Sequence, residues 1–249
     1  MFLVENCANS ALSALRAQEA GASRIELCAG MPEGGTTPSF GEIKLARELL
    51  TIKLHVIIRP RGGDFLYDET EARIMLEDIR MARELGVDGV VIGCLTPEGE
   101  LDVPLMRRLI EAAEGLSVTC HRAFDMCRDR VSALETLIEL GCDRVLTSGG
   151  AATALEGADE LARLVDQAQG RIVVMPGCGV NASNIQTLVH RTQAREYHLS
   201  ARSSYPSPMR YRHEGVSMGG VVHLDEYSRE LTDPDKIASV LHLLASLEE

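Results

Sequence analysis

The sequence predicts a protein of the α/β class with a (β/α)8 TIM barrel. Eight short, β-branched segments alternate with helical segments over the first 200 residues, which is the repeat of such a barrel. A local pattern recurs at Gly21, Gly86 and Gly141, where a helix-ending glycine precedes a polar turn and the start of a strand. A doubly wound sheet is the alternative, but neither Gly-x-Gly-x-x-Gly nor a P-loop motif is present. We therefore predict one domain over residues 1–249, with its barrel core at 1–200.

Apolar and β-branched runs that are bounded by turn residues mark the strands. The run Val56-Ile57-Ile58-Arg59-Pro60 is typical: it ends at proline, which has no N–H to donate to a sheet. The strands are predicted at residues 2–7, 24–28, 53–59, 89–93, 117–122, 144–147, 171–175 and 196–200.

Capping residues mark the helix starts. Ser39 and Asp68 are each followed three residues later by glutamate, which predicts capping boxes. Ser10 and Asn181 are predicted N-cap residues. The helices are predicted at residues 10–20, 39–50, 68–85, 103–113, 131–140, a long helix ending near 169, and 181–191.

The repeat stops after the eighth predicted strand. Residues 201–232 show no clear periodicity and include Tyr205-Pro-Ser-Pro-Met-Arg-Tyr-Arg212 and Met218-Gly-Gly220. Loops of this length are usually functional or disordered, and the aromatic residues and methionines favour a lid or a subunit contact. A last helix is predicted to start at Asp233-Pro234.

Composition limits the partners. The net charge of −12 argues against nucleic acid or an anionic membrane surface, because both require clustered cations. No apolar run approaches transmembrane length. The seven cysteines are scattered and contain no Cys-x-x-Cys pair, which is typical of reduced thiols, so we expect a cytoplasmic protein.

Polar side chains gather near the C-terminal ends of the predicted strands, where barrel sites form. Arg59 and Arg61 share the period of two of the third strand and are expected to point to one side. An ion network that merely fills the barrel is the alternative, but charges concentrated at one end are more typical of a pocket. The candidates for catalysis or substrate binding are Glu26, Arg59, Arg61, Asp64, His121 and Asp125.

Serine and glycine residues follow the last three strands of the predicted barrel. Loops at this place commonly hold phosphate through backbone N–H groups, although glycines also serve simply as tight turns. The candidates for binding a small anion are Ser148, Gly149, Gly177, Gly179 and Ser200.

Two cysteines, Cys7 and Cys28, end the first two predicted strands. Neighbouring strands lie about 5 Å apart, so two thiolates there could share one metal ion. Soft thiolates in low coordination suit Cu(I), whereas zinc favours four ligands. A free cysteine is more often a small buried apolar residue. Cys120 has the opposite parity to His121, so we expect it to face a helix.

Several blocks of sequence together resemble one family. One is His121-Arg-Ala-Phe-Asp-Met126, and the others are residues 25–28, 33–38, 58–65, 144–149 and 208–212. They resemble the CutC family, named for copper homeostasis. The resemblance implies a cytoplasmic barrel, usually a homo-oligomer (dimer or tetramer), with Cu(I) bound at the positions of Cys7 and Cys28. An enzyme acting on a small anionic molecule, including a phosphorylated one, stays open as the alternative.

Overall fold

The computed structural model describes residues 1–213, 215–216, 218 and 225–248. Strand-forming residues are found in eight segments of the barrel and in two later ones. The strands are β1 (Leu3–Ala8), β2 (Arg24–Leu27), β3 (Lys53–Ile57), β4 (Gly89–Ile92), β5 (Ser117–Cys120), β6 (Arg144–Thr147), β7 (Val173–Pro176), β8 (Glu196–Leu199), β9 (Arg202–Pro206) and β10 (Ser228–Thr232).

Helices connect the barrel strands, and one more closes the chain. Among the described residues, no helix combines the length and apolar character needed to cross a bilayer. The helices are α1 (Ala11–Glu19), η1 (Met31–Glu33), α2 (Phe40–Leu49), α3 (Glu69–Glu84), α4 (Val103–Ala112), η2 (Arg122–Met126), α5 (Arg130–Glu139), α6 (Ala158–Ala168), α7 (Ile185–Thr192) and α8 (Pro234–Ala245).

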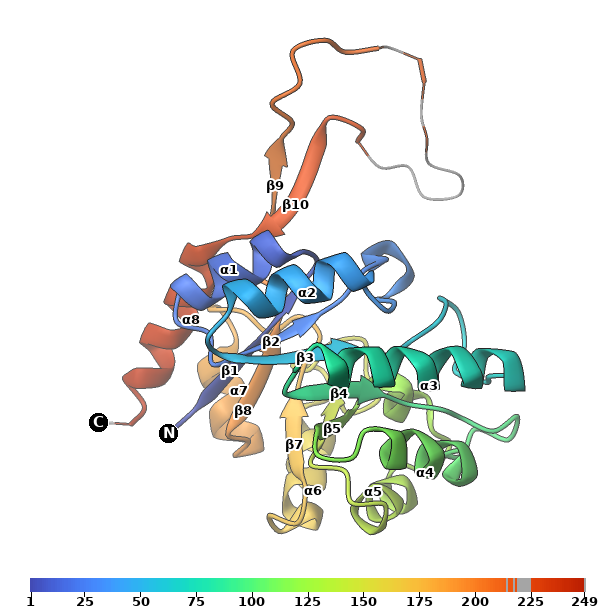
Figure 1. Cartoon of the computed structure of the whole chain (residues 1–249). Helices are drawn as coiled ribbons and strands as arrows, with labels where there is room; N and C mark the ends of the chain where they lie inside the picture. The colour runs from blue at the N-terminus through green and yellow to red at the C-terminus, as the bar shows by residue number, and fades with distance from the viewer. Residues whose placement is uncertain (214, 217, 219–224, 249) are drawn as a thin grey trace.

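The eight barrel strands are all parallel and run in the order β7-β6-β5-β4-β3-β2-β1-β8. The helices lie outside them (Figure 1). At the remaining seam, Gly177 after β7 lies so close to β8 that an added Cβ would meet the His198 Cβ at 3.3 Å. The strands therefore form a nearly closed barrel, and the predicted fold class is confirmed.

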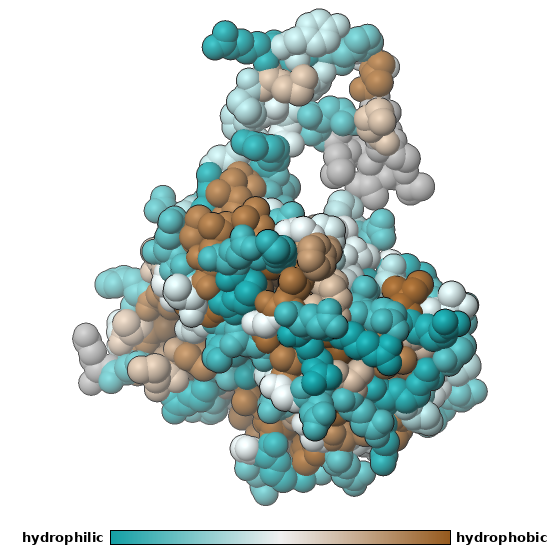
Figure 2. All heavy atoms as spheres, in the orientation of Figure 1, coloured by the Kyte–Doolittle hydropathy of each residue, from teal (hydrophilic) through white to brown (hydrophobic). Residues whose placement is uncertain are grey.

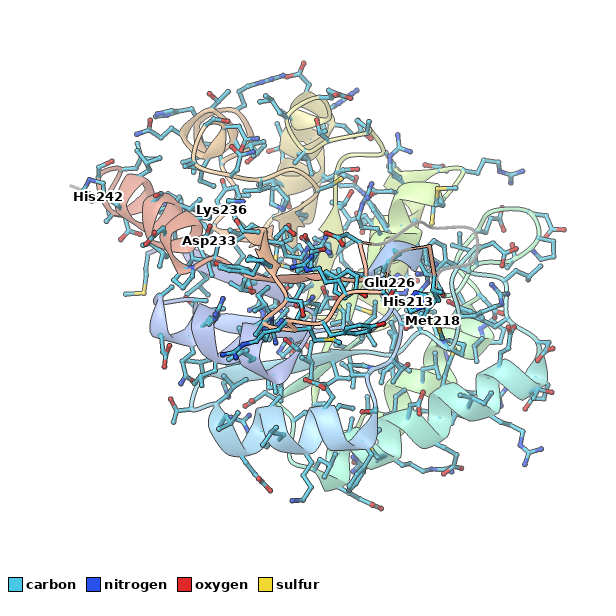
Figure 3. All side chains as sticks on the ribbon, turned by 90° about the horizontal axis from the view of Figure 1, so that it is seen from above. His213, Met218, Glu226, Asp233, Lys236 and His242 are labelled. Carbon is cyan, nitrogen blue, oxygen red and sulfur yellow. The ribbon has the colours of Figure 1, made fainter. Side chains whose placement is uncertain are left out.

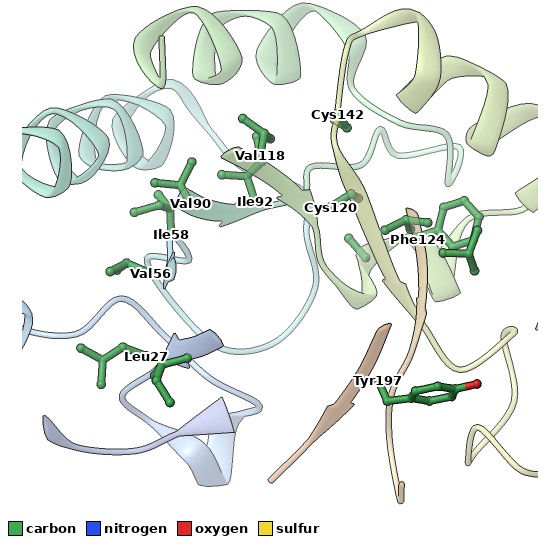
Figure 4. Close-up of a cluster of buried hydrophobic side chains, with 14 of the residues drawn as sticks. Leu27, Val56, Ile58, Val90, Ile92, Val118, Cys120, Phe124, Cys142 and Tyr197 are labelled. Carbon is green, nitrogen blue, oxygen red and sulfur yellow. The ribbon is translucent and has the colours of Figure 1, made fainter. Parts of the chain in front are cut away.

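The barrel strands are buried on both faces, as expected for a parallel sheet covered by helices. On β3, Val56 packs outward in the main core, whereas Ile57 joins a small inner cluster with Val91 and two cysteines. Figure 4 shows the outward-facing set, which includes Val118 and Cys120 of β5. The expectation that Cys120 faces the helices is confirmed.

Most helix starts agree with the predicted caps. Asp68 forms the full capping box with Glu71, and Ser10 caps α1. Ser39 accepts from the Glu42 N–H, but the Glu42 carboxylate bonds to the backbone N–H of a residue in α1 instead of closing a box.

The predicted cap at Asn181 is wrong. The Asn181 side chain accepts the Ser183 N–H at 2.8 Å, which closes a local turn. This turn delays the helix, and Asn184 becomes the N-cap of α7.

The prediction of a loop over residues 201–232 is also wrong in part. β9 and β10 pair as an antiparallel ribbon that projects from the barrel, and its base is fixed by a bond from Ser203 Oγ to Asp233 (2.8 Å). The ribbon's side chains are exposed or only partly buried, except for Leu231 and Thr232 at its base, so no buried face imposes a period on the sequence. Residues 214, 217 and 219–224, which include two positions of the Met218-Gly-Gly220 segment, lie outside the described residues.

Two views show where this ribbon lies. Apolar side chains gather where it meets α1 (Figure 2). From above, His213, Met218 and Glu226 lie near one another, and His242 of α8 lies apart from them (Figure 3).

A layer of charged side chains fills the inside of the barrel below the cysteines. Arg24 donates to Glu5 and, at 2.6 Å, to Glu196. Glu196 also accepts from Arg144 at 2.6 Å. All four side chains are buried. Because each charge has an opposite partner, the layer avoids the cost of an unpaired buried ion.

His55 completes this layer as a neutral group. Its side chain is buried and Nδ1 has no hydrogen-bond partner. Burial, with Arg24 and Arg144 nearby, lowers its pKa from 6.5 to about 4, although Glu5 acts in the opposite direction. The ring fits because the neighbouring residue on β4 is Gly89, where an added Cβ would lie 2.6 Å from His55 Nε2.

Substituting Gly89→Ala should therefore destabilise the barrel. The added Cβ would also meet the Ser117 carbonyl at 2.7 Å, and overpacking of this kind costs about 1–3 kcal/mol. Gly41→Ala is the matched control, because a Cβ at Gly41 in α2 meets nothing within 4 Å, and it should be neutral or slightly stabilising. Urea unfolding of both variants measures the difference. Equal effects would show that the space at Gly89 does not matter.

The free energy of unfolding should also depend on His55 in acid. Because the folded pKa is below the unfolded one, its contribution is complete above about pH 6.5 and falls as the pH drops toward 4. Between pH 6.5 and 5 the native protein should lose about 1–2 kcal/mol more than His55→Gln. Above pH 7.5 the two stability curves should run parallel. Parallel curves down to pH 5 would contradict the prediction.

Candidate functional site

A cavity of about 290 Å³ lies at the C-terminal ends of the strands, above the charged layer. Its floor and walls include Cys7 of β1, Glu26 of β2, Cys28 directly after β2, and His198 of β8. Parallel pairing explains this grouping: Cys7 lies opposite Glu26, and the Cys28 N–H bonds to the Ala8 carbonyl. The end of the first two strands thus delivers both cysteines to one place.

The two sulfur atoms lie 3.7 Å apart, and both side chains are buried. The hydrogen bond between the two sulfurs, followed by the effect of His198, lowers the pKa of Cys7 well below that of a free thiol despite its burial. The same bond and burial raise the pKa of Cys28. Cys7 is therefore the more acidic thiol of the pair.

His198 and Glu5 were not among the sequence candidates. His198 Nδ1 lies 2.8 Å from Glu5 Oε1, and Nε2 lies 3.7 Å from Glu26 Oε2. Burial alone would lower the His198 pKa, but bonds to Cys7 and Glu5 and the charge of Glu26 raise it well above its usual value. The available signal was parity: His198 alternates with Glu196 along β8, so both side chains face the barrel interior.

These groups form a set of donors that could hold a metal ion. One ligating atom from each of Cys7, Glu26 and His198 lies within 4.8 Å of the others. Burial, followed by the negative charge of Cys7, raises the Glu26 pKa to about 8. A thiolate, an imidazole and a carboxyl group around one point suit a soft or borderline metal.

Arg59 and His121 line the same cavity. Arg59 donates from Nη1 to the carbonyls of Glu33 (2.8 Å) and Gly35 (2.9 Å), and from Nη2 to that of Gly63 (2.8 Å). Its guanidinium carbon lies 5.0 Å from the centre of the Phe65 ring. Arg59 thus ties the loops after β2 and β3 together at the mouth of the cavity.

His121 stands directly after β5. Its Nδ1 accepts the Ala123 N–H at 3.2 Å. Burial and the nearby Arg59 charge lower its pKa to about 3, so the ring is neutral and its proton is assigned to Nε2. The ring centre lies 5.0 Å from that of Phe65.

Arg61 and Asp64 lie outside the cavity lining. Arg61 donates to Glu71 at 2.5 Å and to Asp64 at 3.0 Å, and its guanidinium lies over the Tyr67 ring. The expectation that it points the same way as Arg59 fails because β3 already ends at Ile57. The period of two holds only within a strand.

Asp125 lines the cavity, but its carboxylate is already bound. It accepts from Thr147 Oγ1 (2.5 Å), from the N–H groups of Ser148 (3.1 Å) and Gly150 (3.0 Å), and from Arg122 (2.7 Å). The Gly149 N–H bonds to Thr147. The loop after β6, predicted to hold an external anion, thus holds an internal carboxylate.

The remaining candidates for anion binding lie elsewhere. The Gly177 N–H bonds to the Thr147 carbonyl (3.0 Å), and this residue packs against β8. Gly179 and Ser200 line a separate cavity of about 460 Å³, which is also lined by Lys236 of α8. The structure thus divides the predicted anion-binding residues among three places.

The chain is similar to a known protein family over most of its length. The model of the CutC family matches residues 2–203. A family protein CutC from Bacteroides thetaiotaomicron is 58% identical over 246 residues, covering 98% of this chain and 99% of the relative. A copper homeostasis protein cutC homolog from Mus musculus is 48% identical over 239 residues, covering 96% of this chain and 88% of the relative.

A solved structure agrees with these relatives. The crystal structure of the CutC protein from Streptococcus agalactiae superimposes with a TM-score of 0.77 at 38% sequence identity, covering 80% of this chain and 98% of that one. The family match covers most of the chain, and the relatives are similar from end to end. The chain therefore belongs to the CutC family.

Proposed function

We propose that this protein serves copper homeostasis by binding Cu(I) between Cys7 and Cys28. The observation that carries the proposal is the pair of buried sulfur atoms 3.7 Å apart at one cavity. Sulfur is the ligand that Cu(I) prefers in proteins. The Mus musculus relative is described as a copper homeostasis protein, which supports a copper-related role.

The spacing of the sulfurs favours a third ligand. With metal–sulfur bonds of about 2.3 Å, two sulfurs in a straight line with the metal would lie about 4.6 Å apart. The observed 3.7 Å separation fits a bent arrangement. His198 and Glu26 are the neighbouring groups that could complete it.

The setting of the protein is part of the proposal. All seven cysteines are free, which agrees with a reducing cytoplasm. Residues 1–249 would act as one domain. A homo-oligomer, either a dimer or a tetramer, is supported by the exposed Met209 and Tyr211 between β9 and β10, because large apolar side chains of this kind are typical of contact surfaces.

A second candidate function is an enzyme that acts on a small anionic substrate in the same cavity. The observation that favours it is Arg59, a buried cation at the C-terminal face of a TIM barrel. Glu26 and His121 would then be the groups placed for acid–base work, because the Asp125 carboxylate is already fully engaged.

Replacing both cysteines should abolish tight Cu(I) binding. An anaerobic titration against a competing Cu(I) chelator should show at least a 100-fold loss of affinity in the Cys7→Ser, Cys28→Ser double variant, because serine hydroxyls are poor ligands for a soft ion. Cys178→Ser is the matched control: this thiol is partly exposed and bonds to the Ala152 carbonyl. Equal affinity in all three proteins would rule out the proposed thiolate site.

Replacing His198 separates a two-ligand site from a three-ligand one. If His198 completes the site, His198→Gln should weaken Cu(I) binding about 10–100-fold, as expected when a supporting ligand is lost, while both cysteines remain. Glu33→Gln is the control, because it introduces the same amide side chain at an exposed position and should leave the Cu(I) affinity unchanged. Unchanged affinity would leave the two sulfurs as sufficient ligands.

A further inference from the structure

Three arginines are buried among the residues that the structure describes: Arg24, Arg59 and Arg144. Arg24 and Arg144 both form ion pairs with Glu196, and Arg24 also pairs with Glu5. Arg59 differs: within the described residues it forms no ion pair, its Nη1 and Nη2 donate to backbone carbonyls, and its guanidinium also interacts with the Tyr67 hydroxyl. A buried cation without an anion is costly and needs a reason.

Arg59 also has one N–H donor, at Nε, without a hydrogen-bond partner. The side chain is 4% exposed. The three carbonyl bonds of Nη1 and Nη2 hold the guanidinium in place across two loops, so its position does not depend on a bound ligand. A charge fixed in advance by neutral groups is the arrangement that favours binding of an external anion.

His121 provides a second donor near the first. It is also 4% exposed, and its Nε2 has no partner. Both groups line the same cavity, and the Phe65 ring lies 5.0 Å from each. Phe65 is only partly buried and lines the cavity together with both residues.

We propose that the cavity binds a small monocarboxylate, whose oxygens accept from Arg59 and His121 while its apolar body packs against Phe65, Ile57 and Leu146. A planar guanidinium matches a carboxylate in shape, and the volume of about 290 Å³ admits a compact molecule. The inference rests on the second candidate function only if the bound carboxylate is also the substrate of an enzyme. The binding itself does not require copper.

A carboxylate fits this place better than a phosphate does. The backbone N–H groups after β6 that could cradle a phosphate are bound by Asp125. That carboxylate also takes up the charge of Arg122 at 2.7 Å. One uncompensated cation then remains for the ligand, which matches one negative charge. A phosphate dianion would also lie in a cavity that contains Glu26 and Cys7.

The test compares carboxylates with their uncharged amides on the reduced, metal-free protein. Calorimetric titrations would use acetate against acetamide, benzoate against benzamide, and inorganic phosphate. At least one of the carboxylates should bind saturably and at least tenfold more tightly than its amide. Binding should fall at least tenfold in Arg59→Gln and stay unchanged in Arg61→Gln. Arg61 is the matched control because it follows β3 as well but is paired with Glu71.

A second measurement keeps the test decisive if Arg59→Gln does not fold. In the native protein, the Arg59 Nε–H resonance, assigned through its absence from Arg59→Lys, should shift with the bound carboxylate and stay in place with the amide. Because these titrations use metal-free protein and Cu(I) affinity is measured separately, failure of this proposal can be told apart from failure of the copper site. Equal binding of carboxylate and amide, tighter binding of phosphate, or no saturable binding by any probe would overturn the proposal.

Discussion

The contact on which the rest of the site depends is the one that Glu5 makes inside the barrel. Its carboxylate accepts from Arg24 below and from His198 Nδ1 at 2.8 Å above. Burial would raise the Glu5 pKa, but Arg24 and then His198 lower it strongly, so the group stays ionised. The charged layer that fills the barrel and the histidine beside the thiols are thus one network. A change in either part would alter the orientation of His198 and the charge that reaches Cys7.

Two charged side chains at the mouth of the cavity, Asp125 and Arg59, differ in whether their charge is neutralised by a neighbour. Asp125 fills its own set of donors after β5 and β6 and therefore presents a closed, neutral surface. Arg59 is held by carbonyls, which accept from Nη1 and Nη2 but leave Nε without a partner and do not neutralise the charge. Hydrogen bonding and charge compensation are separate requirements for a buried ion. The chain meets both requirements at Asp125, but at Arg59 it meets only part of the first, which gives the cavity a fixed positive charge.

The sequence predicts the barrel well because the hydrophobic periodicity and the capping and turn residues agree along most of it. The first three β-branched runs of the barrel are each followed by a helix with a side-chain N-cap, as at Ser10 and Asp68, so local and global preferences coincide there. Cys7 and Cys28 could be paired from strand ends alone, since parallel neighbours bring their C-terminal ends together. Prediction fails where the strand period is extended past a strand, as for Arg61. It also fails for the ribbon β9–β10, whose side chains are exposed or partly buried except at its base, so that no buried face leaves a pattern.

The sequence also does not predict which group a loop residue binds. Ser148 and Gly149 carry a pattern typical of anion binding, but the nearest anion is Asp125 from the preceding loop. No local rule distinguishes an internal carboxylate from an external one. His198 can be placed at the end of a strand, but its role is not predicted, because that role depends on Glu5, which lies 193 residues away in the chain.

The two proposed ligands share one cavity, and their charges connect them. Cu(I) held by two thiolates carries one net negative charge, and Arg59 is the cation without an ion-pair partner among the described residues that line this cavity. Gly35 joins the two parts directly: its carbonyl accepts from Arg59, and a Cβ placed there would lie 3.7 Å from the Cys28 sulfur. The Arg59 charge would therefore attract both a bound carboxylate and a negatively charged copper–thiolate centre, and the two anions would repel each other. Each would weaken the binding of the other by the same factor, because linkage between two sites is reciprocal.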